Sequence, residues 1–366
     1  MRVLIYGVNS KNKGAQLLLA TTSAWLSEHG HQPVVSMRDV NADTRKELSM
    51  LPMVSVERLG AFRSFGWDQL PSTFIRHIKI VPDGAFDYVL DVSGFSMTDA
   101  WGMQPLTSRL GRLRRWKKLG IGYSMLPQAF GPFDNPGMAE SAAEVFGLTD
   151  RIWARDKTSE RYVKGVYDDH RKVSVAPDVT IGLAVDTTRT PKRDVIIVPN
   201  WNIGSRENKS KMPSYIDSLA QIIIDLTQEG RRITGLCHEG PNDLQILNAV
   251  AERTRGLEVL SPTSGMECKK VIAQSNLVVA GRYHAAVSAL SSSVPVVAHS
   301  WSHKYEALMS DFEVEDGLAD PFDPSSTMSR IQSLQLEKET SRLRVIHDSV
   351  KSRVDAMWTE LNTMLP

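Results

Sequence analysis

Residues 277–287 have the sequence LVVAGRYHAAV. The first four are apolar, Gly281 permits a tight turn, and the small residues that follow suit a helix packed close to a sheet. This pattern predicts a strand, a turn and a helix, with Arg282 and His284 at the carboxyl end of the strand and in the first helical turn. Ligands of open α/β sheets bind at this edge, where backbone N–H groups and the positive helix end favour anions. The local sequence alone equally allows Arg282 on the surface and His284 as a packing residue.

The alternation of strand and helix continues through the second half of the chain. Short apolar runs alternate there with amphipathic stretches, which indicates a parallel sheet with crossover helices. We expect strands at residues 194–199, 232–236, 257–260, 277–280 and 294–298. The last of these leads through a polar loop into a helix that carries Lys304. Lys304 is therefore expected at the same sheet edge as Arg282 and His284.

The first half opens with the same kind of pattern. An apolar strand at residues 3–6 precedes a polar loop at residues 7–14 and a helix at residues 15–28, as in a Rossmann-like half. The loop has neither the Gly-x-Gly-x-x-Gly pattern nor a Walker A sequence, so it does not specify a dinucleotide or a nucleoside triphosphate. Its lysines and asparagines suit a substrate hydroxyl as well as solvent.

Polar residues also follow other strands of this first half. They stand at the edge where such sheets bind ligands, and they include Asp91, Asp99, Gln128 and Arg155. Arg155 lies between a strand and a helix, as Arg282 does. For Asp91 a turn-capping role is favoured over a direct role. Gln128 suits fixing its own loop as well as contact with a ligand.

Length and composition limit the classes of protein. The 366 residues are enough for two domains, and 42% hydrophobic with 23% charged residues suits a globular protein. A formal net charge of +1 gives no indication of a nucleic-acid partner. The two cysteines form neither a disulfide framework nor a metal-ligand pattern. No apolar run approaches the roughly 18 residues that span a bilayer, and the opening run is too short for a secretion signal. We therefore expect a cytoplasmic protein.

The pattern predicts an α/β fold with two Rossmann-like domains. A polar, proline-bearing linker near residues 187–193 marks the expected boundary. The expected parts are an N-terminal domain at residues 1–186, a C-terminal domain at 187–325, and a helical segment at 326–366 that could pack back across both domains.

Seven short segments, taken in their order along residues 1–305, resemble the polysaccharide pyruvyl transferase family. Each is weak alone, but the ordered set is fairly specific. The segments are Asn12-Lys13-Gly14-Ala15, Asp91-Val92-Ser93-Gly94 with Asp99, Pro127-Gln128-Ala129-Phe130-Gly131-Pro132, Ala154-Arg155-Asp156 with Ser159, Ala176-Pro177-Asp178, Gly281-Arg282-Tyr283-His284, and Val294-Pro295-Val296-Val297 with Lys304. Many members carry Gly-Asp in place of Gly14-Ala15 and Gly-Gly in place of Ser93-Gly94, and these departures concern the acceptor side more than the donor side.

The resemblance implies a GT-B type fold, with two Rossmann-like domains facing across a cleft. It also implies transfer of pyruvate from phosphoenolpyruvate to two hydroxyls of one sugar in an exopolysaccharide or its precursor, giving a cyclic ketal and phosphate. Arg155, Arg282 and Lys304 would then bind the phosphate and carboxylate of the donor. His284 would be the general acid or a ligand of the donor phosphate.

The acceptor would lie on the N-terminal domain and the donor on the C-terminal domain. The expected acceptor-binding residues, one of which could be the base, are Asn12, Gly14, Asp91, Asp99 and Gln128. Neither a metal nor a cofactor besides the donor substrate is expected. A lipid-linked acceptor would bring the protein to the inner membrane face, where the basic helix at residues 106–118 would offer a peripheral contact.

Two other functions fit parts of the sequence. A GT-B glycosyltransferase with a nucleotide-sugar donor would need an acidic residue for the ribose hydroxyls, and Glu239 and Glu306 do not make that case strongly. A non-catalytic sugar- or anion-binding protein would be favoured by loss of Arg155, Arg282 or His284, and all three are present.

Overall fold

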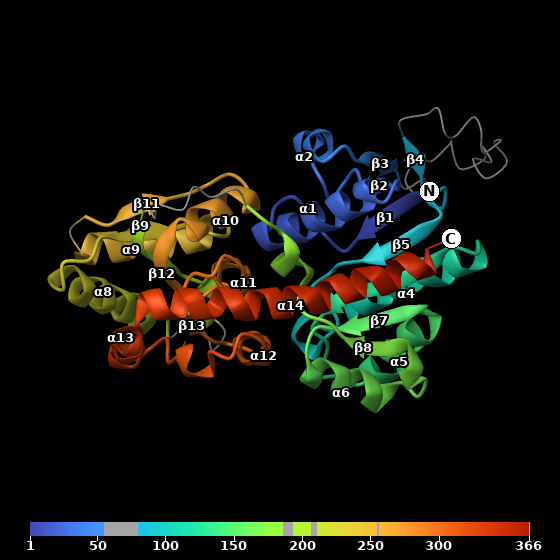
Figure 1. The fold of residues 1–366 in the computed structure, drawn as a ribbon. Helices are drawn as coiled ribbons and strands as arrows, with labels where there is room; N and C mark the ends of the chain where they lie inside the picture. Colours follow the sequence, from blue (N-terminus) through green and yellow to red (C-terminus); the bar gives the residue numbers. More distant parts are fainter. Residues whose placement is uncertain (55–79, 186–192, 206–210, 255, 366) are drawn as a thin grey trace. The chain divides into compact units, whose positions relative to one another are not determined.

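The computed structural model describes residues 1–54, 80–185, 193–205, 211–254 and 256–365. They form two parallel-sheet α/β domains, which confirms the predicted fold class (Figure 1). Among these residues, none of the helices combines the length and the apolar character needed to cross a bilayer.

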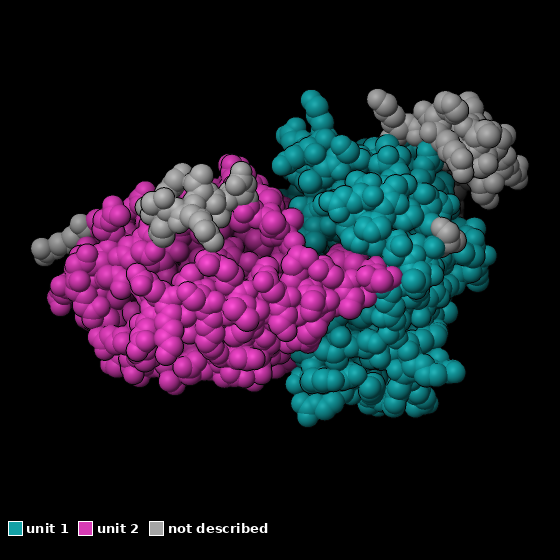
Figure 2. Space-filling model, viewed as in Figure 1, with its two compact units in different colours: residues 1–10, 18–179, 360–366 teal, residues 11–17, 180–359 magenta. Residues whose placement is uncertain are grey.

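The chain divides into two compact units, which Figure 2 shows in separate colours. Unit 1 contains residues 1–10, 18–179 and 360–366, and unit 2 contains residues 11–17 and 180–359. The change between Val179 and Thr180 lies a few residues ahead of the expected boundary at 186/187, and residues 187–192 of the expected linker are outside the described residues. The first and last long helices each contribute residues to both units.

Unit 1 is built on a parallel sheet whose described strands run in the order β4-β3-β2-β1-β5-β6-β7-β8. The apolar strands predicted at its start and centre form as expected. The strands are β1 (Arg2–Tyr6), β2 (Gln32–Ser36), β3 (Leu51–Val54), β4 (Val81–Pro82), β5 (Tyr88–Asp91), β6 (Gly122–Gln128), β7 (Arg151–Ala154) and β8 (Val173–Val175). The α-helices assigned between them are α1 (Lys13–Glu28), α2 (Ala42–Glu47), α4 (Met103–Lys118), α5 (Met138–Leu148) and α6 (Lys157–Val166).

Unit 2 has a parallel sheet whose described strands run in the order β11-β10-β9-β12-β13-β14. These strands are β9 (Arg193–Val198), β10 (Ile233–Leu236), β11 (Glu258–Leu260), β12 (Ser275–Ala280), β13 (Val296–His299) and β14 (Leu318–Ala319). The helices are α7 (Trp201–Ser205), α8 (Met212–Gln228), α9 (Gly240–Thr254), α10 (Gly265–Ala273), α11 (Tyr283–Ser291), α12 (His303–Asp311), α13 (Pro324–Ser333) and α14 (Leu336–Met364).

Helices cover both faces of each sheet. In unit 2 the chain moves outward from β9 through α8 and α9, and then returns through α10 and α11. Because crossovers between parallel strands are right-handed, outward and returning helices lie on opposite faces. The contacts agree, since α8 packs beside α9 and α10 packs beside α11 (Figure 1).

Each unit has its own apolar core, formed where the helices meet the sheet. Strands covered on both faces become nearly continuous apolar runs, and in β12 the residues Leu277 to Ala280 are all buried. In unit 2 these strands pack against the apolar faces of α8, α9 and α13. The polar residues discussed below lie at or near the carboxyl edges of the two sheets.

Candidate active site

The strand order of the second sheet reverses direction between β9 and β12. From β9 the chain moves through β10 to β11 and then returns to β12 on the other side of β9. Ligands of open α/β sheets bind outside the carboxyl ends of the strands at such a switch point. These ends lead to Asn200 after β9 and to Gly281 after β12.

Gly281 forms a turn that leaves no room for a side chain. Its carbonyl oxygen accepts hydrogen bonds from Nδ2 of Asn200, at 2.8 Å, and from the hydroxyl of Tyr305, at 2.7 Å. A Cβ atom added at Gly281 would lie 2.9 Å from the hydroxyl oxygen of Tyr215, closer than real Cβ atoms approach. The turn therefore fixes the start of α11, where Arg282 and His284 are located.

Arg282 is the N-cap residue of α11 and is bound by two carboxylates of the loop and helix after β10. Its guanidinium donates to Asp243 through Nε at 2.8 Å and Nη2 at 2.6 Å, and to Glu239 through Nη1. The side chain of Asp243 is 0% exposed and that of Arg282 is 14% exposed. A guanidinium has five N–H groups, so these three bonds leave two for a ligand as far as the described residues go.

The charge of Arg282 is secured by this arrangement. Burial alone would lower the pKa of Arg282, but the hydrogen bonds and charge of Asp243, together with the charge of Glu239, outweigh burial and raise that pKa. A planar cation held by a bidentate carboxylate keeps its fork in one orientation. Arg282 is therefore positioned before any ligand binds.

The ring of His284 lies against the first turn of α1. A Cβ atom added at Gly14 would lie only 2.2 Å from Nδ1 of His284. Asn12 caps the same turn, since its Oδ1 accepts from the backbone N–H of Ala15 at 2.8 Å and its Nδ2 donates to Glu239. The structure thus gathers within unit 2 four residues that were predicted from two separate segments. They are Asn12, Gly14, Arg282 and His284.

Lys304 lies in the first turn of α12 within an aromatic enclosure. Its ammonium nitrogen is 4.5 Å from the ring centre of Trp301, 5.2 Å from that of Tyr283 and 5.8 Å from that of Tyr305. Cation–π contacts attract an ammonium to the faces of aromatic rings. Tyr305 also bonds to Gly281, so the enclosure is tied to the turn that carries Arg282.

Three residues of this cluster were missed by the sequence analysis as site residues. Lys13 is buried and donates from Nζ to the carbonyl oxygen of Cys237 at 2.9 Å. His238 and Asp243 follow β10, at the same edge as Gly281. For His238 and Asp243 the signal in the sequence is a polar run directly after the buried strand β10.

Asp91 is the centre of a buried polar network in unit 1. Its Oδ2 accepts from Nε of Arg109 at 2.8 Å and from the hydroxyl of Tyr123, while its Oδ1 accepts from Nε2 of Gln128 at 3.1 Å. The backbone N–H of Ser93 donates to the same Oδ1 at 3.0 Å, as expected for a residue that caps the following turn. Asp91 and Gln128 therefore lie together, and their bonds join the carboxyl ends of β5 and β6.

Two other predicted residues of unit 1 also have structural partners. Asp99 accepts from the backbone N–H groups of Asp134, at 2.7 Å, and Asn135, at 3.1 Å. Arg155 donates from Nη1 to Asp178 at 2.9 Å, and both side chains are buried. Arg155 is part of unit 1, whereas the other predicted donor ligands, Arg282 and Lys304, are part of unit 2.

The basic face expected on α4 is largely paired. The ion pairs join Arg109 to Asp91, Arg114 to Glu144, Arg115 to Asp83 and Lys117 to Asp150. Carboxylates so close reduce the attraction of this helix for an anionic surface. The membrane contact stays a prediction.

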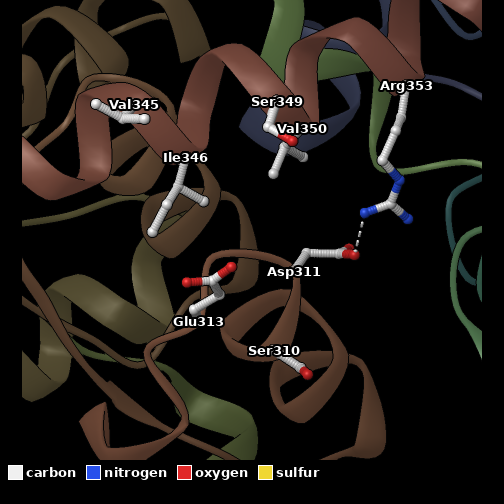
Figure 3. Close-up of a pocket in the computed structure, with 8 residues that line it drawn as sticks. All are labelled: Ser310, Asp311, Glu313, Val345, Ile346, Ser349, Val350 and Arg353. Carbon is white, nitrogen blue, oxygen red and sulfur yellow. Dashed lines mark hydrogen bonds and ion pairs between the residues drawn. The ribbon is translucent and has the colours of Figure 1, made fainter.

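The pocket drawn in Figure 3 contains none of the predicted residues. It has a volume of about 540 Å³ and lies between α14 and the end of α12. Arg353 and Asp311 form an ion pair across it at 2.7 Å. The other lining residues are Ser310, Glu313, Val345, Ile346, Ser349 and Val350. These groups do not converge on one point as ligand-binding polar groups do, and we assign no function to the pocket.

The sequence profile of the family described as polysaccharide pyruvyl transferase matches residues 12–303. The chain belongs to the polysaccharide pyruvyl transferase family. It is therefore a transferase, and the resemblance drawn from the short segments is confirmed. The matched range begins at Asn12 and includes Arg155, Arg282 and His284, but it stops one residue before Lys304. A comparison with curated protein sequences found no match.

Solved structures that contain UDP or UDP-GlcNAc have the same fold, which confirms the predicted GT-B type. A UDP-GlcNAc 2-epimerase from Neisseria meningitidis bound to UDP-GlcNAc is 12% identical, with a TM-score of 0.61 over 98% of this chain and 100% of the other. Anabaena Alr3699/HepE in complex with UDP and glucose is 12% identical, with a TM-score of 0.61 over 100% and 99% of the two chains. The S. aureus MnaA–UDP structure is 14% identical, with a TM-score of 0.60 over 93% and 90%.

Proposed function

We propose that this transferase moves pyruvate from phosphoenolpyruvate onto two hydroxyls of one sugar in an exopolysaccharide or its precursor. The observation that carries the proposal is the fixed cation Arg282, standing beside His284 at the switch point of the second sheet in a member of this family. Phosphoenolpyruvate carries a phosphate and a carboxylate, both of which suit the planar fork of an arginine.

The chemistry gives each residue of the cluster a task. A proton is added to the methylene carbon of the enol, one sugar hydroxyl attacks the adjacent carbon, and a second hydroxyl displaces the phosphate. Of the two hydroxyl protons, one balances the proton given to carbon and one leaves with phosphate. The products are a cyclic ketal and inorganic phosphate. His284 supplies the first proton or binds the phosphate, since an imidazole suits either role near neutral pH.

The cations bind the donor and stabilise the charge that develops on the leaving phosphate. Arg282 offers its two remaining N–H groups, and Lys304 offers an ammonium whose nitrogen lies 4.5 Å from the ring centre of Trp301. Arg155 is the third donor ligand in the proposal, and its partner Asp178 fixes its orientation. The acceptor residues of the proposal are Asn12, Gly14, Asp91, Asp99 and Gln128.

Transfer of a sugar from a nucleotide sugar is the second candidate. Three solved structures with this fold carry UDP, UDP-GlcNAc, or UDP with glucose, and this likeness at 12–14% identity concerns the fold. A nucleotide donor needs contacts to a base and to ribose hydroxyls. Glu239 is the nearest acidic residue to Arg282 apart from Asp243, and both are already bound to that arginine.

An acceptor panel tests the proposal. The protein is incubated with phosphoenolpyruvate and a series of galactose, mannose and glucose glycosides, free or lipid-linked, and acceptor-dependent phosphate release is measured with NMR detection of the ketal methyl group. We expect release with one acceptor class, and a loss on the order of 100-fold in Arg282→Ala and His284→Ala. The matched control is Arg253→Ala, which removes an arginine paired at 2.9 Å with the exposed Asp217. Sugar transfer from a uridine nucleotide sugar, without any reaction of phosphoenolpyruvate, would replace the proposal with the second candidate.

A further inference from the structure

His238 is a buried histidine to which neither the sequence pattern nor the proposed mechanism gives a role. It lies in the short loop between β10 and α9 and is 2% exposed. The loop leaves the second sheet at the same carboxyl edge as the turn that carries Arg282 and His284, and its Glu239 binds Arg282.

The residues on either side of His238 are both held by the cluster. The carbonyl oxygen of Cys237 accepts from Nζ of Lys13 at 2.9 Å. The carboxylate of Glu239 binds Arg282 and Asn12. The backbone of His238 is therefore fixed from both sides.

The ring of His238 carries an unsatisfied polar atom. Its Nε2 is buried and has no hydrogen-bond partner among the described residues. A buried polar nitrogen left without a partner destabilises the fold, and nearly all such atoms in proteins are paired with protein, water or ligand. Because this nitrogen stands at the sheet edge beside Arg282, it is a candidate for a hydrogen bond to a ligand.

The surroundings of His238 favour an anion as that ligand. Burial, followed by the positive charges of Arg282, His284 and Lys13, holds the pKa of His238 well below its usual value. The ring is therefore neutral, with one N–H to give, in a place where cations gather. The N-terminus of α9, a helix of 15 residues, begins at Gly240 and adds to the positive potential there.

We propose that His238 binds the donor directly, through a hydrogen bond from Nε2–H to a phosphate or carboxylate oxygen of phosphoenolpyruvate. The inference rests on the proposed function. It adds a neutral hydrogen-bond donor to the cationic ligands Arg282 and Lys304 and makes His238 a residue that touches the substrate. A bound anion also offsets the positive charges of Lys13 and Arg282. The affinity for the anion and the protonation of the His238 ring are therefore coupled.

Two substitutions separate a contact with the donor from a packing role. His238→Gln places an amide N–H near the position of Nε2, whereas His238→Asn is too short to do so. We expect His238→Asn to raise the Kd for phosphoenolpyruvate at least about tenfold, and His238→Gln to stay within about threefold of wild type, since one hydrogen bond to a charged group contributes about 1.5–3 kcal/mol. Titrations with inorganic phosphate and with pyruvate show which end of the donor His238 contacts.

His299→Gln is the matched control, because His299 is a second fully buried histidine of unit 2 with one orphaned ring nitrogen. Its Nε2 is paired with Thr327 at 2.9 Å and its ring packs near Tyr215, so we expect an unchanged Kd. An unchanged Kd in His238→Asn, or equal losses in His238→Asn and His238→Gln, would overturn the inference while the proposed function stands. Wild-type protein that binds no phosphoenolpyruvate would instead remove the proposed function, and this inference with it.

A measurement on the wild-type protein covers the case in which a His238 variant does not fold. In long-range ¹H–¹⁵N spectra, the ring nitrogens of the two buried neutral histidines are told apart with His299→Gln, which removes one set. We expect the His238 signals to shift on addition of phosphoenolpyruvate and the His299 signals to stay. Unmoved His238 signals at saturation would contradict the contact.

Discussion

The approach of His284 to the first turn of α1 depends on the absence of a side chain at Gly14. The glycine is in helical conformation, where alanine is ordinarily more stable by about 1 kcal/mol. Its Cβ atom would, however, lie 2.2 Å from Nδ1 of His284. At this position, packing of the site residue outweighs helix propensity.

Gly14→Ala should therefore reduce activity without unfolding the protein. We expect kcat/KM to fall on the order of 100-fold, because displacing a reacting group by about 1 Å costs about that much. Steady-state kinetics and thermal unfolding of the same sample check this. Gly111→Ala in α4 is the control, since nothing lies within 4 Å of an added Cβ there. Equal activity of Gly14→Ala and wild type would remove His284 from the proposed chemistry.

Some site residues could be predicted from the sequence because their positions follow from local pattern. Arg282 and His284 stand next to a strand and a glycine, and that order alone places them at the sheet edge. Their partners could not be predicted in this way. Asp243 is 39 residues from Arg282, and the packing of α9 beside the turn after β12 decides that they meet. The place of His238 after a buried strand was a signal in the sequence, but its buried, unpaired nitrogen is a property of the packed structure.

At the scale of the secondary-structure elements, the first turn of α1 packs against the first turn of α10. The backbone N–H of Gly265 donates to Oε1 of Gln16 at 2.7 Å, and a Cβ atom at Gly265 would lie 2.3 Å from the carbonyl oxygen of Lys13. Ser264 and Glu267 form a capping box that fixes the start of α10. The helix start that carries Asn12, Lys13 and Gly14 is therefore held in place by α10.

Gly265→Ala should separate these two helix starts. The clash is with backbone, which cannot yield as the end of a side chain does, so we expect a loss of about 1–3 kcal/mol in stability together with weaker binding of phosphoenolpyruvate. Urea unfolding and donor titration measure the two effects. Gly165→Ala in α6, where an added Cβ meets nothing within 4 Å, should change neither. Unaltered stability and affinity of Gly265→Ala would show that this contact does not position Lys13.

The regular elements were predictable where strand and helix patterns are long and alternate. The elements not predicted include β3, β4, α2 and α5. The first three are short, with two to six residues each, and a few residues do not establish a period. In α5 the buried residues Met138, Ala142, Val145 and Phe146 do have helical spacing, but a proline- and glycine-containing loop precedes them and obscured the start.

At the scale of the whole molecule, the buried histidines make the free energy of unfolding depend on pH. Burial lowers the pKa of His299 to about 4, against an unperturbed value of about 6.5. Between these values the unfolded chain binds a proton that the folded chain does not. The contribution of His299 to the free energy of unfolding is therefore largest above pH 6.5 and falls as the pH decreases toward 4.

We expect His299 to contribute a slope of about 1.4 kcal/mol per pH unit between pH 6 and pH 5. His238 acts in the same direction, because its pKa is also lowered. Urea unfolding of wild type and His299→Gln at several pH values isolates the contribution of His299. Parallel pH profiles for the two proteins would mean that His299 takes up its proton without unfolding.

The division into two α/β units with separate sheets could be predicted from the sequence, because the chain length and the alternation of strand and helix patterns indicate it. The assignment of residues 11–17 to unit 2 could not be predicted. It reverses the expected placement of Asn12 and Gly14, which the division at 186/187 put in the N-terminal domain, and it brings them to Arg282 and His284. Such an exchange depends on tertiary contacts, and no local pattern encodes it.

Calorimetric titration of the wild-type protein with phosphoenolpyruvate, and separately with UDP-GlcNAc and UDP-glucose, tests the central claim most directly. The account predicts saturable binding of phosphoenolpyruvate that is lost in Arg282→Ala and retained in Arg253→Ala, with neither nucleotide sugar competing. A ligand present at 100 times its Kd would also stabilise the fold by about 2.7 kcal/mol. Binding of a nucleotide sugar that depends on Arg282, with none of phosphoenolpyruvate, would contradict it.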